Sequence, residues 1–554
     1  MTQKNQDHTI GSYLIKKLYE KGVRHVFGIP GDYVLDFYEQ LVDSKLAVIN
    51  TCDEQGAGFA ADAYARLCGL GAVCVTYGVG GLKLVNTTAQ AFAEESPVVV
   101  ISGAPGMKER EINPLLHHKV RTFDTQMKIF EQITVACAIL NDPETAPREI
   151  DRVISAALRH KRPVYIELPR DKVSVHIMRH RSILGTKQSS DRDALQEAIT
   201  EALHMINNAE KPCTLVGAEL KRYGLQDQLL EFVERTNIPV ATTILGKSVI
   251  SGYHPLCMGV YAGAISRESV RDYVESSDCL IIIGAYMTDI NTGIFTAQID
   301  QSRTLQITSE KIAIRHHIYD NVQMQDFLLE LIKSCKQAKE SDKNRKKIPH
   351  IDAPKPFSPI PRKRITVQRL FQCINSFLSD NMIVVTDVGD ALFASTDLIM
   401  HERTEFLSPA YYACMGFAVP AAIGSQLAQP HMRPLVLVGD GAFQMTGMEL
   451  SVAVRFDLNP IVVVLNNRGY ATERQIVDGP FNDLQHWEFS KISQVIGGGR
   501  GYVIEDEEQL HKTLIEALEY KQGFCILDVR LGSGDISLAL DRLTSALAKQ
   551  VRSA

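Results

Sequence analysis

Long uncharged runs, an excess of charge of one sign and paired cysteine motifs are all missing from this 554-residue sequence. No apolar run reaches the roughly eighteen uncharged residues that a membrane-spanning helix needs, so we expect no membrane span. The formal net charge is −6 and the pI about 6.3, which does not favour nucleic acid as the main partner. The first residues, MTQKNQDHTIGSYLIKKL, lack the basic-then-apolar pattern of a secretory signal. These absences predict a protein that binds neither membranes nor nucleic acid.

The eleven cysteines are scattered and form no CxxC pair and no regular spacing. An odd count without such a framework favours reduced thiols in a cytoplasmic protein, most of them buried as small apolar side chains. We therefore expect neither a zinc site nor a redox site.

What the sequence does contain is an alternation of strand-like and helix-like segments along almost its whole length. Hydrophobic residues make up 45% and charged residues 22%, ordinary values for a globular enzyme with several cores. Short β-branched runs such as VRHVFGIPG and AVCVTYG end in turn residues and are followed by helical patterns, which begin at Val34 and Leu82. This alternation predicts βαβ units and parallel sheets, and hence an α/β fold.

Two interruptions divide the chain. Periodicity is lost over residues 177–192, and residues 336–364 are rich in lysine, arginine and proline. We interpret the second stretch as an exposed linker rather than a nucleic-acid patch, because basic runs are more often solvated connectors. No short repeat relates the resulting segments, although a shared architecture for the first and third stays open. The predicted domains are residues 1–182, 190–336 and 365–554, with residues 337–364 as the linker.

An acidic residue stands at the end of a buried strand in LVLVGDGAFQMTGMEL, residues 435–450. Ligands of open parallel sheets bind beyond the carboxyl ends of the strands, where Asp440 is placed. The glycines beside it let the backbone turn and approach a ligand, and a helix starting there offers free N–H groups to a phosphate. A tight turn capped by the aspartate explains an isolated GDG about as often.

A second buried strand, later in the chain, also ends in polar residues, which favours ligand binding over a purely structural turn. Residues 442–465, twenty-four in all, separate the GDG motif from Asn466-Asn467 in NPIVVVLNNRGYATE. Neighbouring parallel strands place their ends side by side, so the carboxylate of Asp440, one asparagine amide oxygen and a backbone carbonyl near Gly469 can form a small site of oxygen ligands. Such a site suits Mg²⁺, which takes few protein ligands and completes its octahedron with phosphate oxygens and water.

This combination, GDG followed after twenty-four residues by NN, resembles the motif with which thiamine-diphosphate enzymes hold their cofactor through Mg²⁺. The resemblance implies that Asp440, Asn467 and the carbonyl of Gly469 bind the metal. It also places Gly441 and Ala442 at the cofactor, although serine is common where this sequence has Ala442.

A thiamine cofactor needs a carboxylic acid beside its aminopyrimidine ring, to favour the imino tautomer that takes the thiazolium proton. In VINTCDEQGAGFAADAYAR a short strand is followed by Asp53-Glu54 and a helix rich in alanine and glycine. In a purely structural interpretation, Glu54 is an acidic residue that is favourably placed in the first turn of a helix. The resemblance instead makes Glu54 the activating glutamate.

Three further features narrow the family. Asp32 follows a Pro-Gly turn in FGIPGDYVLDF, His117 and His118 are adjacent in NPLLHHKVRTFDTQMKIFE, and Glu473 stands in NNRGYATERQI. An isolated His-His pair is usually a surface accident. Together with Glu54, these residues closely resemble those of the pyruvate, indolepyruvate, phenylpyruvate and branched-chain 2-oxo acid decarboxylases, where they would shuttle protons to the reacting carbon.

The resemblance covers all three segments and implies non-oxidative decarboxylation of a 2-oxo acid to an aldehyde and CO₂. The implied fold has three domains of open, mostly parallel sheet flanked by helices: pyrimidine-binding, central and diphosphate-binding. In the family the active site lies between the first domain of one subunit and the third domain of another. We therefore expect a homodimer or homotetramer whose monomer is inactive.

Family positions also indicate how the cofactor is contacted. In YYACMGFAVPAA, the carbonyl of Ala413 would accept from the exocyclic amine, and Met415 would hold the cofactor bent. Met415 fits plain core packing equally well. In TDVGDALFASTD, Asp390 replaces a hydroxyl residue often found near the cofactor.

Val388, Leu392 and Thr472 fall at positions that line the substrate pocket. The segment GDALF looks more like the arylpyruvate branch of the family than the ethanol-forming enzymes, so we expect medium or bulky substrates, branched or aryl. A single apolar contact changes discrimination by only about 1–3 kcal/mol, so no pocket residue settles the substrate.

Three alternatives stay open. The same cofactor supports carboligation, as in acyloin or acetolactate-type synthases, although synthases of the acetohydroxyacid type lack the His-His arrangement. A pyruvate-specific decarboxylase is the second alternative. The third is a non-catalytic nucleotide-binding scaffold, because the central segment resembles a domain that binds FAD elsewhere. The joint presence of Glu54, the histidine pair, Glu473 and the metal ligands argues against it.

Overall fold

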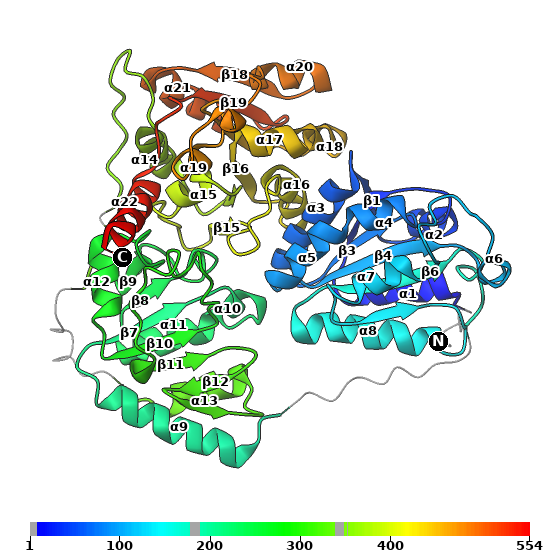
Figure 1. Ribbon diagram of the computed structural model, residues 1–554, viewed down its shortest axis with the longest axis horizontal. Coiled ribbons are helices and arrows are strands. Elements are labelled where there is room, and N and C mark those ends of the chain that lie inside the picture. Colours follow the sequence, from blue (N-terminus) through cyan, green and yellow to red (C-terminus); the bar gives the residue numbers. More distant parts are fainter. Residues whose placement is uncertain (1–7, 178–188, 338–347, 352, 554) are drawn as a thin grey trace, which may run out of the picture.

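Figure 1 shows the computed structural model of the protein, which consists of three α/β domains. Parts of the predicted linker and of the predicted break at residues 177–192 lie outside the described residues. None of the helices that the structure describes is long and apolar enough to span a membrane. The described residues are 8–177, 189–337, 348–351 and 353–553.

The first domain is a six-stranded parallel sheet in the order β2-β1-β3-β4-β6-β5. Its strands β3 and β4 are buried along their whole length, as in parallel sheets covered on both faces. The helix expected from Leu82 begins earlier, at Val79, and is divided at Leu84 into α4 and α5. The strands are β1 (His25–Ile29), β2 (Ala47–Asn50), β3 (Gly71–Val75), β4 (Val98–Ala104), β5 (Cys137–Ile139) and β6 (Val164–Pro169), and the helices are α1 (Ile10–Glu20), α2 (Leu35–Val42), α3 (Glu54–Cys68), α4 (Val79–Lys83), α5 (Val85–Ala93), α6 (Met107–Ile112), α7 (Thr125–Phe130) and α8 (Ala146–His160).

The central domain has a seven-stranded sheet in the order β13-β12-β11-β10-β7-β8-β9. Its strands β7 to β11 pair in parallel, and β12 and β13 add an antiparallel edge. The strands are β7 (Pro212–Val216), β8 (Val240–Thr242), β9 (Cys257–Val260), β10 (Cys279–Ile283), β11 (Thr304–Ile307), β12 (Ile312–Ile314) and β13 (His317–Tyr319), and the helices are α9 (Arg192–Asn207), α10 (Glu219–Arg222), α11 (Gln226–Thr236), α12 (Glu268–Glu275), η1 (Gln301–Arg303) and α13 (Met324–Ser334).

The third domain is a parallel sheet in the order β15-β14-β16-β17-β19-β18. Counted from its own first strand, this is the strand order of the first domain, so the two share one architecture. The predicted fold of mostly parallel sheets flanked by helices is confirmed. The strands are β14 (Met382–Thr386), β15 (Glu405–Leu407), β16 (Arg433–Gly439), β17 (Ile461–Asn466), β18 (Arg500–Ile504) and β19 (Cys525–Arg530), and the helices are α14 (Val367–Phe377), α15 (Asp390–Ser395), α16 (Ala418–Ala428), α17 (Asp440–Thr446), η3 (Gly447–Glu449), α18 (Leu450–Arg455), α19 (Ala471–Arg474), η4 (Pro480–Asn482), η5 (Phe489–Lys491), α20 (Ile492–Ile496), α21 (Glu507–Glu519) and α22 (Leu538–Ser553).

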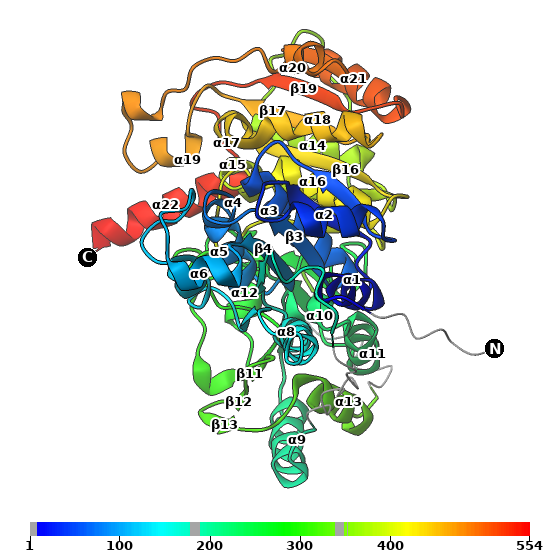
Figure 2. The same cartoon turned by 90° about the vertical axis from the view of Figure 1, so that its right-hand side faces the viewer.

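The first and third domains pack through α3 and α16, which lie side by side (Figures 1 and 2). A Cβ on Gly424 would meet the carbonyl oxygen of Ala60 at 2.0 Å, so only glycine allows this approach. The rings of Phe59 and Phe417 meet edge to face with centroids 5.7 Å apart. One hydrophobic core therefore includes residues of both domains and fixes their relative position.

A buried ion pair secures the same interface. Arg66 of α3 donates to Glu94 at 3.1 Å and to the carbonyl of Ser408 in the third domain at 2.8 Å. Glu94 accepts from the backbone N–H groups of Tyr411 and Tyr412 at 2.8 and 3.0 Å. Because a buried charge is costly unless it is fully hydrogen-bonded, these contacts hold the loop before α16 in one place.

Candidate active site

A pocket of about 390 Å³ lies in the third domain, at the carboxyl ends of β14, β16 and β17. We call it the C-terminal pocket. Ile290 of the central domain and Tyr470 also line it. The pocket is lined by twelve of the residues predicted from the sequence, namely Val388, Asp390, Leu392, Ala413, Met415, Asp440, Gly441, Ala442, Asn467, Gly469, Thr472 and Glu473.

Asp440 and Asn467 come together because β16 and β17 are neighbouring parallel strands. Asp440 is 3% exposed, and its carboxylate accepts from the backbone N–H groups of Gly441 at 2.8 Å and Arg468 at 2.6 Å. Burial raises the pKa of Asp440 to about 6. A buried carboxylate beside an amide oxygen is a set of hard donors, and a divalent cation there would favour the ionised form. These residues fit Mg²⁺.

Two of the three glycines in these motifs are closely packed, whereas a Cβ on Gly439 would meet no atom within 4 Å. A Cβ on Gly441 would meet the ring of Tyr470 at 2.5 Å, and a Cβ on Gly469 would meet the carbonyl oxygen of Asn482 at 2.4 Å. The first asparagine of the NN pair, Asn466, donates to Asp528 at 2.7 Å and stays outside the pocket lining.

A carboxylate that the sequence analysis missed, Asp387, organises the wall that carries Met415. Asp387 follows β14, is fully buried, and accepts from the backbone N–H groups of Gly416 at 3.0 Å and Ala418 at 2.8 Å. Burial raises the pKa of Asp387 to about 6. Ala413 in the same loop has a left-handed φ of 58°. Because Asp387 directly follows a buried strand, as Asp440 does, the same signal could have identified it.

Asp390 lines the C-terminal pocket, but its carboxylate already has a protein partner. It accepts from the backbone N–H of Ser537 at 2.8 Å and from the Ser537 hydroxyl. Burial raises the pKa of Asp390 to about 6. The contacts connect α15 to the segment before α22, and a cofactor contact for Asp390 stays a prediction.

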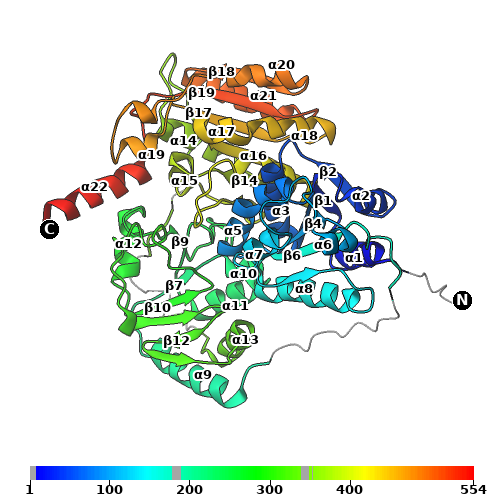
Figure 3. The same ribbon diagram turned by 45° about the vertical axis from the view of Figure 1, so that its right-hand side comes forward.

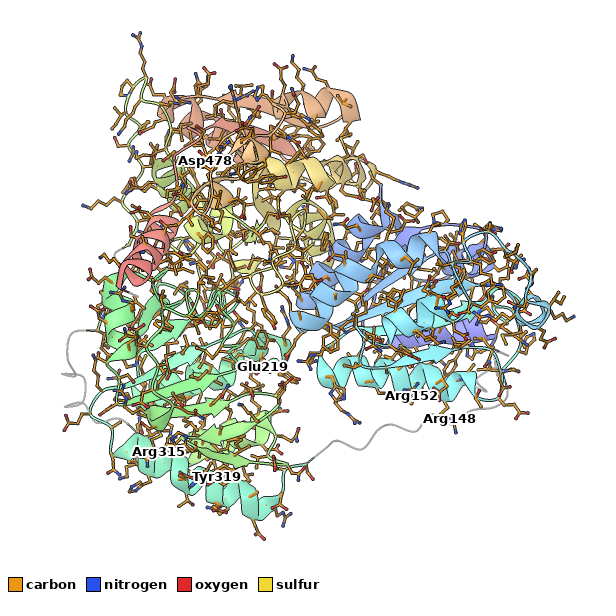
Figure 4. All side chains as sticks on the ribbon, in the orientation of Figure 1. Arg148, Arg152, Glu219, Arg315, Tyr319 and Asp478 are labelled. Carbon is orange, nitrogen blue, oxygen red and sulfur yellow. The ribbon has the colours of Figure 1, made fainter. Side chains whose placement is uncertain are left out.

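Glu473 lies in α19. The next residue, Arg474, makes two ion pairs with the segment that follows. Arg474 pairs with Asp478 at 2.7 Å and also with Asp483. Figure 4 labels Asp478 in this part of the third domain. A Cβ on Gly389 would lie 3.6 Å from the Thr472 hydroxyl, so the starts of α15 and α19 border one space.

The remaining predicted residues lie in the first domain, and three of them form one cluster. His117 Nε2 lies 2.8 Å from Asp32 Oδ2, and the rings of His117 and His118 are nearly perpendicular with centroids 4.7 Å apart. His118 Nδ1 lies 3.0 Å from the carbonyl oxygen of Tyr77, and its φ of 66° is left-handed. Gly78 makes this turn possible, because a Cβ there would meet the carbonyl oxygen of His118 at 2.4 Å.

Glu54 is the first residue of α3, directly after the N-cap Asp53, and its side chain is 13% exposed. Lys83 Nζ lies 3.2 Å from Glu54 Oε2 and also contacts Asp53. Glu449 of the third domain accepts from the backbone N–H groups of Cys52 and Asp53, each at 3.0 Å. Burial raises the pKa of Glu449 to about 7. Neither Lys83 nor Glu449 was predicted from the sequence, because no local pattern marks them.

The two groups of residues lie apart within one chain. The described lining of the C-terminal pocket includes no residue of the first domain. Figures 1 and 3 show α19 in the left half of the molecule and α6, which leads to the histidine pair, in the right half. Asp32, Glu54, His117 and His118 all lie in the first domain, outside this pocket, and we call them the N-terminal half-site.

Comparison with known proteins matches all three domains. Residues 8–129 match the family model of the thiamine pyrophosphate enzyme N-terminal TPP binding domain, residues 199–333 that of the central domain, and residues 387–529 that of the C-terminal TPP binding domain.

Several known proteins are similar over nearly the whole chain. An indole-3-pyruvate decarboxylase of Azospirillum brasilense is 35% identical over 540 residues, 96% of each chain. Pyruvate decarboxylase 3 of Arabidopsis thaliana is 30% identical over 548 residues, 96% of this chain and 92% of that one. A probable pyruvate decarboxylase of Schizosaccharomyces pombe is 30% identical over 547 residues, 97% of this chain and 96% of that one.

Proposed function

Because the chain belongs to the thiamine-pyrophosphate-dependent 2-oxo acid decarboxylases, we propose that it converts 2-oxo acids with medium or bulky side chains into an aldehyde and CO₂, with Mg²⁺ and thiamine diphosphate bound. The observation that carries the proposal is the pocket in which Asp440, Asn467 and Glu473 meet. The N-terminal half-site around Glu54 supplies the other groups that such a reaction needs.

We assign the cofactor to the C-terminal pocket. Asp440, Asn467 and the carbonyl of Gly469 would bind Mg²⁺, and the buried Asp440 carboxylate supports this assignment. Backbone groups of Gly441 and Ala442 would face the diphosphate. When bound, thiamine diphosphate supplies the carbon nucleophile and accepts the electron pair that the departing CO₂ leaves behind.

The remaining cofactor contacts are proposals as well. The carbonyl of Ala413, held by the left-handed turn, would accept from the exocyclic amine, and Met415 would support the bent cofactor. Met415 also packs against the hydrophobic core, so one side chain can serve both purposes. Asp390 lines the same pocket and would lie near the cofactor.

The titratable residues of the two half-sites would hold and move protons. Glu54 would hold the proton that activates the cofactor ring. Asp32, His117, His118 and Glu473 would deliver protons to the carbon that loses CO₂. The 2.8 Å approach of Asp32 and His117 supports a shared proton network.

A second copy of the chain would complete the site. The N-terminal half-site and the C-terminal pocket lie apart in one chain, and each is bordered by apolar side chains that are at least 61% exposed. A homodimer or homotetramer that joins the first domain of one chain to the third of another would cover them. These exposed apolar residues are Ile112, Leu115 and Val120 near the histidines and Ile476, Val477 and Phe481 after Glu473.

The substrate is proposed from the side chains of the C-terminal pocket. Val388, Leu392 and Thr472 line it together with Ile290. The A. brasilense relative is named as an indole-3-pyruvate decarboxylase, and indole-3-pyruvate has a bulky aryl side chain. We therefore propose branched and aryl 2-oxo acids as the substrates.

We also propose a cytoplasmic location. Seven of the eleven cysteines are buried and all eleven are free thiols, which supports a reducing compartment.

A substrate panel tests this function. The purified protein, given thiamine diphosphate and Mg²⁺, is assayed with pyruvate, 4-methyl-2-oxopentanoate, phenylpyruvate and indole-3-pyruvate. We expect aldehyde and CO₂ in equal amounts, with kcat/KM highest for a branched or aryl acid. Highest kcat/KM for pyruvate would overturn the substrate assignment, and acyloin as the main product would point to a carboligase.

A further inference from the structure

An ion pair at the N-terminal half-site involves a lysine that none of the proposed steps uses. Lys83 is the last residue of α4, and its ammonium group lies 3.2 Å from Glu54 Oε2. Lys83 also contacts the carboxylate of Asp53. The helix itself packs onto Glu54, because a Cβ on Gly80 would lie 3.4 Å from Glu54 Oε1. The cation is therefore brought to Glu54 by the fold of α4 onto α3.

We propose that Lys83 is a positioning residue for Glu54: its ammonium group holds the Glu54 carboxylate in place and puts a positive charge beside the proton that Glu54 would share with the cofactor ring. This inference rests on the proposed role of Glu54 as the acid that activates the cofactor.

The effect on the reaction follows from charge. An activating acid and the nitrogen of the cofactor ring share one proton, which resides on either partner. A positive charge beside Glu54 disfavours that proton on both, so Lys83 lowers the proton affinity of the pair. Hydrogen bonds to Asp53 and Glu54 raise the pKa of Lys83, so the ammonium group stays charged over the working pH range.

The other titratable groups near Glu54 do not supply a positive charge. Burial lowers the pKa of His25, which leaves that ring neutral near pH 7. The helices α5 and α16, which also pack on α3, contain no titratable side chain. The groups on the neighbouring elements are Cys52 and Asp53 before α3, Tyr38 on α2, Cys74 on β3, His25 on β1, Glu449 on η3 and Lys83 on α4.

The expected size of the effect is small but measurable. The Lys83 side chain is 49% exposed, so water screens the pair. Ion pairs exposed to this degree change the pH at which a partner group is half protonated by about half a unit.

Proton uptake on cofactor binding is the direct test. Titration calorimetry of thiamine diphosphate into the apo-protein with Mg²⁺, repeated in buffers of different ionisation enthalpy, counts the protons taken up at each pH without any turnover. In Lys83→Met, the pH at which uptake falls to half should rise by about half a unit. Lys83→Gln is a second neutral variant, and Lys83→Arg should keep the wild-type midpoint.

Two controls separate this effect from others. Lys21→Met removes one positive charge at the end of α1, before β1, and should leave the midpoint unchanged. Asp53→Asn removes a negative neighbour and should lower the midpoint, opposite in sign to Lys83→Met. A cofactor analogue with carbon in place of the ring nitrogen should show no uptake with any variant.

The outcomes distinguish the two proposals. If Glu54→Gln abolishes proton uptake while Lys83→Met and Lys83→Gln keep the wild-type midpoint, the inference about Lys83 is wrong and the proposed function stands. If Glu54→Gln leaves proton uptake unchanged, the proposed role of Glu54 is wrong, and the inference about Lys83 is overturned with it.

Discussion

The carboxylate of Glu449, in the third domain, accepts a hydrogen bond of 3.0 Å from the backbone N–H of Asp53, in the first. Asp53 is the N-cap of the helix that begins at Glu54. Glu449 can approach the start of α3 only because residue 56, in the first turn of that helix, is a glycine. A Cβ on Gly56 would meet Glu449 Oε1 at 2.0 Å. One domain of the chain thus fixes the position of the glutamate on the other.

Replacing this carboxylate should flatten the dependence of stability on pH. Burial raises the pKa of Glu449 from 4.5 to about 7, so the folded state binds the proton more tightly than the unfolded state does. This contribution to stability is complete below pH 4.5 and is lost as the pH rises to 7; it amounts to at most about 3 kcal/mol. Between pH 5 and pH 7.5, the Tm of the wild type should fall more than the Tm of Glu449→Gln.

Scanning calorimetry at several pH values gives this comparison. Glu519→Gln, at the exposed end of α21, removes a carboxylate without a buried partner and is the matched control. Parallel Tm profiles for the wild type and Glu449→Gln would show that the buried carboxylate does not carry the effect.

The two adjacent asparagines should behave differently when replaced. Asn467→Ala removes a proposed metal ligand, so the affinity for thiamine diphosphate with Mg²⁺ should fall by about tenfold or more. Asn466→Ala instead removes the hydrogen bond to the buried Asp528, which keeps its ion pair with Arg530 at 2.8 Å, and should cost about 1–3 kcal/mol of unfolding free energy, with cofactor affinity unchanged. Titration calorimetry and urea unfolding measure the two quantities. Equal cofactor affinities for the two variants would refute the ligand assignment.

Adding one methyl group at Gly424 should destabilise the protein. Helix propensity alone favours alanine by about 1 kcal/mol, but the added Cβ would meet the backbone carbonyl of Ala60 at 2.0 Å. The net loss should be about 1–3 kcal/mol, because the clash is with backbone of a packed helix. Gly534→Ala, where the Cβ meets no atom within 4 Å, is the control. A stability gain in Gly424→Ala would contradict the packing of α3 on α16.

Features that follow from local sequence patterns and from the pairing of neighbouring strands could be predicted from the sequence. The placement of Asp440 and Asn467 was predictable because two β-branched runs end in polar residues, and neighbouring parallel strands bring such ends together. Asp387 also follows a buried strand, but the signal is weaker because a valine, not a glycine, comes after it.

Contacts made across the fold could not be predicted. Lys83 reaches Glu54 because α4 ends against the start of α3, and Glu449 reaches Asp53 because the third domain docks there. Neither residue has a neighbour in sequence that indicates its partner. The division of α4 from α5 at Leu84 was likewise missed, since a helical pattern continues across it.

We propose that each active site joins the first domain of one chain to the third domain of another. Glu54→Gln and Glu473→Gln chains, each expected to lose activity by at least about 10²-fold, test it when co-expressed with different tags and purified as a mixed dimer. One site of that dimer then carries both changes and the other carries neither. The mixed dimer should show about half of the wild-type activity. A mixed dimer as inactive as its parents would mean that each chain builds its site from its own domains, which contradicts the claim.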